Sequence, residues 1–189
     1  SMRGSEDAWH VDACERLAAR FGGFIDAPRD ARYAGAFNLA LHRRLFSADE
    51  SLDAQVAALV LDRDALDAAL LGAALAGATD AAVRAALALM QRDRTRQSHF
   101  GRLYLAGRAP GWDDAERARI RAAVAIAREQ FVDSGLLHPA LGAGPEELAL
   151  AHEHAAAAGL GGLSAEAAAL AVSTWRREAG ERLDALGLS

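Results

Sequence analysis

Alanine makes up about a quarter of this chain, and no stretch of four or more residues alternates β-branched side chains. Alanine has the highest helix propensity and leaves little bulk between packed helices. Sheets, in contrast, are built from β-branched and aromatic residues, and aromatic residues are only 6% of the sequence. The composition therefore predicts an all-α protein with closely packed helices.

Glycine and proline divide the sequence into segments that have helical periodicity. The first segment covers about residues 6–21 and stops at Gly22 and Gly23, and the second runs to Phe46. A third starts at residue 52 and either continues through residues 62–64 or breaks there. The later segments are expected at about 80–90, 114–132, 146–158 and 165–186.

Side chains that can cap a helix N-terminus precede several of these segments. The predicted caps are Ser47, Thr79, Asp113 and Ser164, and the first and third are followed three residues later by a glutamate, as in a capping box. Trp112, directly before Asp113, is placed to act as a hydrophobic staple. The segment 107–112 is expected to be a loop.

A chain of 189 residues with short connections is expected to form one domain, residues 1–189, as a single-domain helical bundle of about seven or eight helices. Ser1-Met2 resembles the scar that remains after a tag is cleaved. Residues 1–5 are therefore expected to be a tag remnant and a disordered start.

The charge balance and the missing residue types exclude several functional classes. A net charge of −5 argues against a protein that binds nucleic acid over its whole surface. Lysine is absent, which excludes a lysine Schiff base, and Cys14 is the only cysteine, which excludes an intramolecular disulfide. Neither a signal peptide nor a membrane-spanning stretch is visible, so a cytoplasmic protein is expected.

Polar side chains recur on faces of the expected helices that are otherwise apolar. Asn38 and His42 are one helical turn apart and point into the middle of an apolar arc. His10 and Cys14 have the same spacing, and His152 lies on the apolar side of its segment. The arc around His10 and Cys14 is expected to consist of Trp9, Ala13, Leu17 and Phe21.

A buried imidazole or amide without a partner costs about 1–3 kcal/mol. These groups are therefore expected to bond to one another, to backbone, to water or to a ligand. Mutual hydrogen bonding that fixes the register of two helices is the simplest interpretation. A polar-lined pocket for a small molecule is the second, and a catalytic or metal-binding role is the third.

Known motifs give the third interpretation little support. The stretch HEHAA at 152–156 has alanine where HExxH requires its second histidine, and Glu146 and Glu147 lack the histidine that di-iron bundles place three residues later. No phosphate-binding glycine loop or GxSxG turn is present. No metal site is predicted, and no cofactor can be named from the sequence.

The most basic segment is QRDRTRQSHFGR, residues 91–102. Guanidinium groups bind carboxylates and phosphates, so an anionic ligand or an acidic partner is expected at Arg92–Arg102, with Arg96 and His99 as candidate binding residues. The competing interpretation is a solvated helix face whose charge is balanced by acidic helices elsewhere.

The sequence thus favours a non-catalytic helical domain that binds a small molecule or a protein partner in a partly polar cavity. The candidate ligand-binding residues are Asn38, His42, His10, Cys14, His152, Arg96 and His99. Two alternatives stay open at this point. One is an enzyme that uses a histidine, a cysteine or a metal in the same cavity, and the other is a scaffold or homo-oligomer that associates through alanine-rich faces.

Overall fold

A computed structural model describes residues 2–23, 47, 49–133 and 146–189. In these ranges the chain is helical and contains no strand, which confirms the all-α class. The expected count of seven or eight helices in one bundle includes segments outside the described residues and stays a prediction. None of the described helices is long and apolar enough to cross a bilayer.

The elements follow one another with short connections between them. They are α1 (Met2–Arg20), α4 (Leu52–Gln55), the π-helix η1 (Val56–Arg63), α5 (Asp64–Gly77), α6 (Ala81–Arg108), the 3₁₀ turn η2 (Ala109–Gly111), α7 (Asp114–Arg128), the π-helix η3 (Glu129–Asp133), α8 (Glu146–Ala157) and α9 (Ala165–Asp184). Helix α1 already begins at Met2, where the sequence suggested an irregular start.

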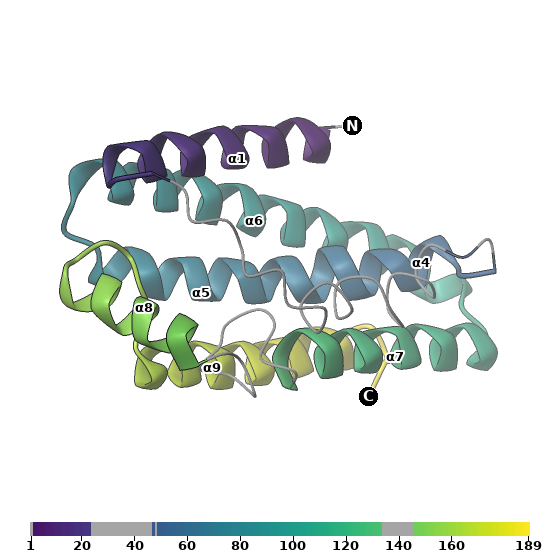
Figure 1. The fold of residues 1–189 in the computed structure, drawn as a ribbon. Helices are drawn as coiled ribbons and strands as arrows, with labels where there is room; N and C mark the ends of the chain where they lie inside the picture. The colour runs from purple at the N-terminus through teal and green to yellow at the C-terminus, as the bar shows by residue number, and fades with distance from the viewer. Residues whose placement is uncertain (1, 24–46, 48, 134–145) are drawn as a thin grey trace.

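The helices are stacked in layers (Figure 1). Helix α1 lies along α6, and α6 lies along the helix that α4, η1 and α5 form without a break. Helices α7 and α9 cover the opposite side of this central helix. The continuation through residues 62–64, which the sequence left open, is therefore realised, but in the wider π-helical form.

The central helix contributes to two apolar cores. One core lies around its first half and includes the fully buried Leu61, Leu105 and Ile120, from η1, α6 and α7. The other lies around its second half and includes Leu66 and Trp175, from α5 and α9. Buried alanines of the first core lie on α4, η1 and α7, in keeping with the close packing that the composition predicts: Ala54, Ala57, Ala58, Ala123 and Ala127.

The π-helix is stabilised by donors from neighbouring helices. A π-helix changes the hydrogen-bond ladder from i→i+4 to i→i+5, and two of its carbonyls accept from side chains of adjacent helices. The Ser98 hydroxyl of α6 donates to the Leu61 carbonyl at 3.0 Å. On the other side, the Trp175 indole of α9 donates to the Asp62 carbonyl at 3.1 Å.

Close contact between α6 and η1 depends on Gly101. A Cβ atom at this position would lie 3.0 Å from the Leu61 nitrogen and 3.1 Å from a methyl carbon of Val60. Only a residue without a side chain lets the two helix backbones approach this closely. The approach brings Ser98, one turn earlier on α6, within reach of the Leu61 carbonyl.

A buried ion pair connects the central helix to α7. The Asp62 carboxylate accepts hydrogen bonds from Arg128 Nε at 3.0 Å and from Arg128 Nη2 at 2.7 Å. Burial raises the pKa of Asp62 above its ordinary value, and the opposing effect of Arg128 is smaller. The Arg128 guanidinium also lies over the Trp175 ring, 5.1 Å from its centre, so α7 and α9 meet the central helix at one point.

Two of the four predicted caps are confirmed and two are wrong. Asp113 and Ser164 accept hydrogen bonds from the backbone amides three residues later. The third helical segment is capped by Ser51 and not by Ser47, and the next by Asp80 and not by Thr79. In both cases a side chain nearer the start of the helix accepts from the amides of the first turn. Ser51 accepts from Ala54, and the Asp80 carboxylate accepts from Ala82 and Val83.

Replacing Ser98 with alanine removes the hydrogen bond that α6 donates to the Leu61 carbonyl. We expect Ser98→Ala to lower the free energy of unfolding by about 0.5–1.5 kcal/mol, measured by urea denaturation. Thr95→Ala is the matched control, because the exposed Thr95 hydroxyl bonds to the Gln91 carbonyl of its own helix. Equal effects of the two substitutions would contradict the role assigned to Ser98.

Candidate functional site

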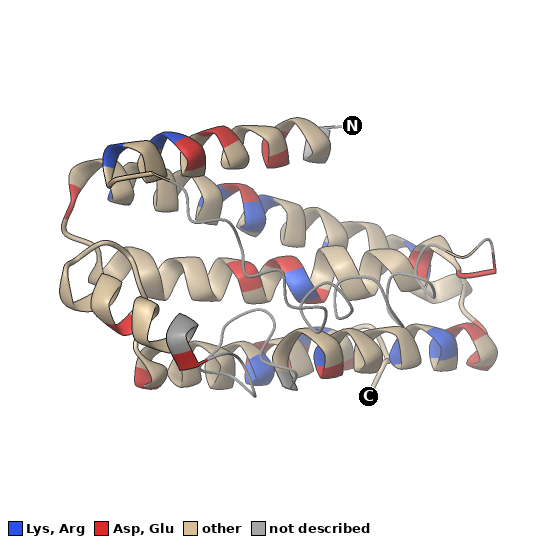
Figure 2. Ribbon diagram, in the orientation of Figure 1, with Lys and Arg blue, Asp and Glu red and all other residues tan. Residues whose placement is uncertain are grey.

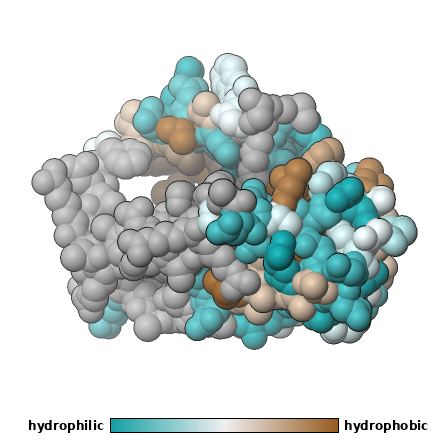
Figure 3. Space-filling model, turned by 90° about the vertical axis from the view of Figure 1, so that its right-hand side faces the viewer, coloured by the Kyte–Doolittle hydropathy of each residue, from teal (hydrophilic) through white to brown (hydrophobic). Residues whose placement is uncertain are grey.

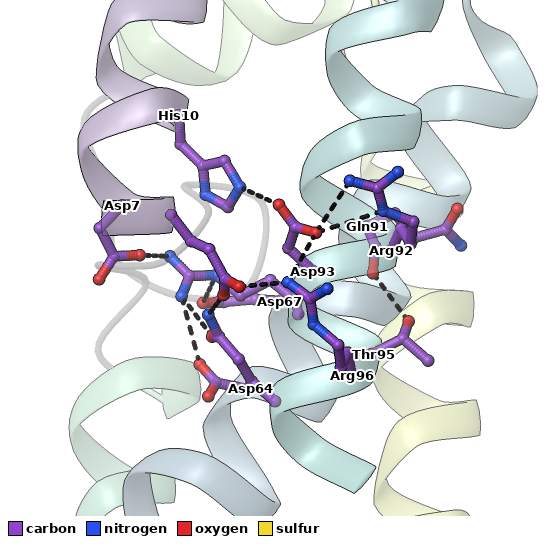
Figure 4. A network of polar contacts seen from close by, with 12 residues as sticks. Asp7, His10, Asp64, Asp67, Gln91, Arg92, Asp93, Thr95 and Arg96 are labelled. Carbon is purple, nitrogen blue, oxygen red and sulfur yellow. Dashed lines mark hydrogen bonds and ion pairs between the residues drawn. The ribbon is translucent and has the colours of Figure 1, made fainter. Parts of the chain in front are cut away.

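The sequence-predicted residues His10 and Arg96 lie in a polar layer between α1, α5 and α6 (Figure 4). His10 is buried, and its Nε2 atom donates to Asp93 Oδ2 at 3.2 Å. Asp93 also receives hydrogen bonds from Arg92 and Arg96 at 3.3 Å. Burial alone would raise the pKa of Asp93, but the bond from His10 and the two arginines together lower it below the ordinary value.

Further ion pairs extend this layer toward α5. The Glu6 carboxylate of α1 accepts hydrogen bonds from Arg96 and Gln97 of α6. Arg94 lies 2.9 Å from Asp7 of α1 and 3.6 Å from Asp64 of α5. Charged residues of α1, α5 and α6 accordingly gather midway along the stack (Figure 2).

The polar layer connects α1, α5 and α6 through ion pairs between their side chains. Of the four arginines in residues 91–102, three are paired with carboxylates of α1, α5 or α6. Exposed Arg102 instead lies 3.3 Å from the ring of His99, which is also exposed. The acidic residues that the competing interpretation required therefore lie on adjacent helices.

The prediction that the apolar face of α1 points inward is wrong. Trp9 is 67% exposed and Phe21 is also exposed, whereas Glu6 and His10 are buried against α6. The reason is the surface that α6 presents at this place, where Asp93 and the neighbouring arginines need polar partners. Helix α1 therefore packs with its polar side inward.

The other predicted residues are not brought together with His10. Cys14 is exposed. His152 on α8 is half-buried, and this burial lowers its pKa. Asn38 and His42 lie outside the described residues. In the described ranges, no group of three or more His, Cys, Asp or Glu side chains is arranged to bind a metal ion.

A concave site occurs elsewhere, where α4, the end of α6 and the start of α7 meet. We call it the Asp53 cleft. It is an open cleft of about 520 Å³, within the range of roughly 300–1,000 Å³ that is typical of small-molecule sites. Its lining comes from three helix ends and includes Ser51, Leu52, Asp53, Tyr104, Arg108, Trp112, Asp113, Glu116 and Arg119.

The buried Asp53 carboxylate organises this cleft. It accepts hydrogen bonds from the Tyr104 hydroxyl at 2.8 Å, the Trp112 indole at 2.6 Å and Arg108 Nε at 3.2 Å. Burial by itself raises the pKa of Asp53, but these three donors outweigh it, so the pKa lies below the ordinary value. For Tyr104, burial and the neighbouring carboxylate both raise the pKa. The aspartate is therefore ionised and the tyrosine is a neutral donor near pH 7.

A second carboxylate of the cleft is also held in place. The Ser51 hydroxyl donates to Glu116 and at the same time accepts from the Ala54 amide as the cap of α4. Arg119 lies 3.5 Å from the other oxygen of Glu116. These contacts attach the first turn of α4 to the first turn of α7.

Two guanidinium groups have donors that these carboxylates do not use. Arg108 bonds to Asp53 through Nε, so its Nη groups are not committed to that carboxylate, and its side chain is 60% exposed. Arg119 meets Glu116 through one Nη and is also exposed. Guanidinium donors in this state bind carboxylate or phosphate oxygens.

Sequence reasoning missed the Asp53 cleft. Asp53 appears as an ordinary acidic residue in the first turn of a helix, and Trp112 was assigned only a packing role beside a cap. The available signal was the spacing of Tyr104, Arg108 and Trp112, which places three hydrogen-bond donors four residues apart. This spacing indicates a shared acceptor only if α6 extends to Arg108, whereas the sequence suggested a loop from residue 107.

Comparison with protein-family models, with curated proteins and with solved structures finds no match to this chain. The geometry of the described residues is therefore the basis for any functional interpretation.

Asp53→Asn tests whether the charge of this carboxylate organises the cleft. A group with a lowered pKa in the folded state stabilises the fold above its ordinary pKa, and this contribution is lost as the pH falls through the folded pKa. We expect Asp53→Asn to lower the free energy of unfolding by about 1–3 kcal/mol at pH 7, and the difference from wild type to shrink toward pH 3. Urea denaturation at several pH values measures it.

Asp49→Asn is the matched control, because Asp49 is exposed and precedes the same helix. A penalty for Asp53→Asn that stays constant from pH 7 to pH 3 would contradict the electrostatic role of Asp53.

Proposed function

We propose that this protein is a non-catalytic helical domain that binds a small anionic molecule in the Asp53 cleft. The observation that carries the proposal is the concave site itself, in which exposed guanidinium groups stand beside aromatic side chains fixed by a buried carboxylate. Small-molecule sites typically combine apolar and aromatic side chains with a few oriented polar groups. In this largely polar cleft, Leu52 and Tyr104 supply the apolar contact.

The charge pattern supports an anion as the ligand. The lining holds three carboxylates, and each is engaged. Asp53 accepts from three donors, Glu116 contacts Ser51 and Arg119, and Asp113 accepts from the Glu116 amide as the cap of α7. The carboxylates are therefore committed to contacts within the protein. The Nη groups of Arg108 and the exposed guanidinium of Arg119 supply donors for the oxygens of a carboxylate or phosphate.

A binding role is favoured over catalysis because the polar groups of the cleft have structural tasks. Ser51 caps α4, and Asp53 orients Tyr104 and Trp112. The alternative of an enzyme that uses His10 and Cys14 has no support from the geometry, since His10 is buried against Asp93 and Cys14 is exposed.

A thermal-shift experiment with acetate, phosphate and larger carboxylates tests the proposal. A ligand at 100 times its dissociation constant stabilises the folded state by about 2.7 kcal/mol, so a bound anion raises the melting temperature in a concentration-dependent way. We expect Arg119→Gln, and more strongly the double variant Arg108→Gln/Arg119→Gln, to reduce this shift.

Arg121→Gln is the matched control, because Arg121 is an exposed arginine of α7 that does not line the cleft. The proposal fails if no anion shifts the melting temperature of the wild type, or if Arg121→Gln reduces the shift as much as the cleft variants do.

A further inference from the structure

We infer that the anion bound in the Asp53 cleft carries a flat aromatic ring. This inference rests on the proposed function and narrows the class of ligand to aromatic compounds with a carboxylate or phosphate group. It follows from the way α6 arranges Phe100, Tyr104 and Arg108.

The polar atoms of the aromatic lining are turned toward Asp53. The Tyr104 hydroxyl and the Trp112 indole nitrogen both donate to this carboxylate. Each ring is thereby fixed in position, and its hydrogen-bonding atom is taken up. Trp112 is buried, and the Arg117 guanidinium lies over its ring. What the partly exposed Tyr104 can offer a ligand is the surface of its ring, which favours contact with another flat apolar group.

Phe100 extends this aromatic surface along α6. Its ring stacks on Tyr104 with a centroid distance of 6.4 Å and an angle of 26° between the planes. The Phe100 side chain is nevertheless 62% exposed. A single exposed apolar side chain is ordinary on a protein surface. Phe100 differs because its ring stacks on Tyr104, which lines the cleft.

The three side chains form a stripe with a definite order. Phe100, Tyr104 and Arg108 are spaced by four residues, so successive members lie on one side of α6 and about 6 Å apart along its axis. The stripe leads from an exposed ring, through a ring in the cleft wall, to an exposed guanidinium. A ligand with an aromatic body and an anionic group at one end is complementary to this order.

The described surface at the end of the molecule that carries the cleft favours a small molecule over a protein partner. Figure 3 shows the end of the molecule where α4 and the start of α7 lie. In the part of this face that is not grey, hydrophobic side chains appear as separate spots in a mainly hydrophilic surface. Surfaces that dock proteins present larger continuous apolar patches.

Isothermal titration calorimetry with five probes tests the inference. Phenylacetate and phenyl phosphate carry both features, acetate and inorganic phosphate carry only the charge, and benzyl alcohol carries only the ring. We expect the two aromatic anions to bind about tenfold more tightly than acetate and phosphate, as one additional aromatic contact allows. Benzyl alcohol is expected to bind more weakly than either aromatic anion.

Phe100→Ala is expected to reduce this tenfold advantage and to leave the affinities for acetate and phosphate unchanged. Phe100→Tyr keeps the ring and is expected to retain the advantage. Leu170→Ala is the matched control, because Leu170 is a similarly exposed apolar residue on α9, away from the cleft. Circular dichroism of each variant verifies that the helical fold is retained.

The outcomes separate the inference from the proposed function. If acetate and phosphate bind but the aromatic anions bind no more tightly, or if Phe100→Ala leaves their advantage intact, the inference is overturned and anion binding stands. If none of the anions binds to the wild type, the proposed function fails and the inference falls with it.

Discussion

The contact between α6 and the central helix determines where the other elements of the described structure lie. At Gly101 the two backbones approach so closely that a Cβ atom would crowd the Leu61 nitrogen. From this point, α6 reaches the polar layer with α1 in one direction and the Asp53 cleft in the other. One long helix thus presents arginines toward α1 and α5, and Tyr104 and Arg108 toward α4.

Buried aspartates of the central helix each have a specific cationic partner. Asp53 pairs with Arg108 of α6, Asp62 with Arg128 of α7, and Asp64 with Arg94 of α6. Buried ion pairs contribute less to stability than their geometry suggests, because desolvation of the charges offsets their attraction. Their effect here is on register, since a shift of either partner helix by one turn would leave a carboxylate buried without its cation. Alanine-rich faces fit together in many registers, and the ion pairs select among them.

The sequence was sufficient to predict the helical class and several element ends, because these depend on local interactions. Alanine content, the glycines at 22–23 and the caps Asp113 and Ser164 act within one or two turns of the chain. The inward position of His10 agrees with the prediction, although the apolar arc on which that prediction rested is exposed at Trp9 and Phe21. The partner of His10 could not be predicted, since Asp93 lies 83 residues away in the sequence.

The Asp53 cleft could not be predicted either, because its residues are also far apart in the sequence. Its carboxylate receives donors that lie 51 to 59 residues further along the chain. The sequence pattern also ended the helix of Tyr104 and Arg108 too early. The orientation of α1 was likewise mispredicted, because the hydrophobicity of a helix indicates its inner face only when the facing surface is apolar. The predicted pairing of Asn38 with His42 lies outside the described residues.

The π-helical turns of η1 have a consequence for how this fold tolerates change in length. Each residue of an α-helix rotates the chain by about 100°, and the widened turns of Val56–Arg63 set the angular phase between Asp53 before them and Asp64 after them. Loss of one residue within this stretch would preserve helicity, yet it would swing one aspartate away from its arginine. In related sequences, the number of residues between these two aspartates is therefore expected to vary less than the types of the residues that lie between them.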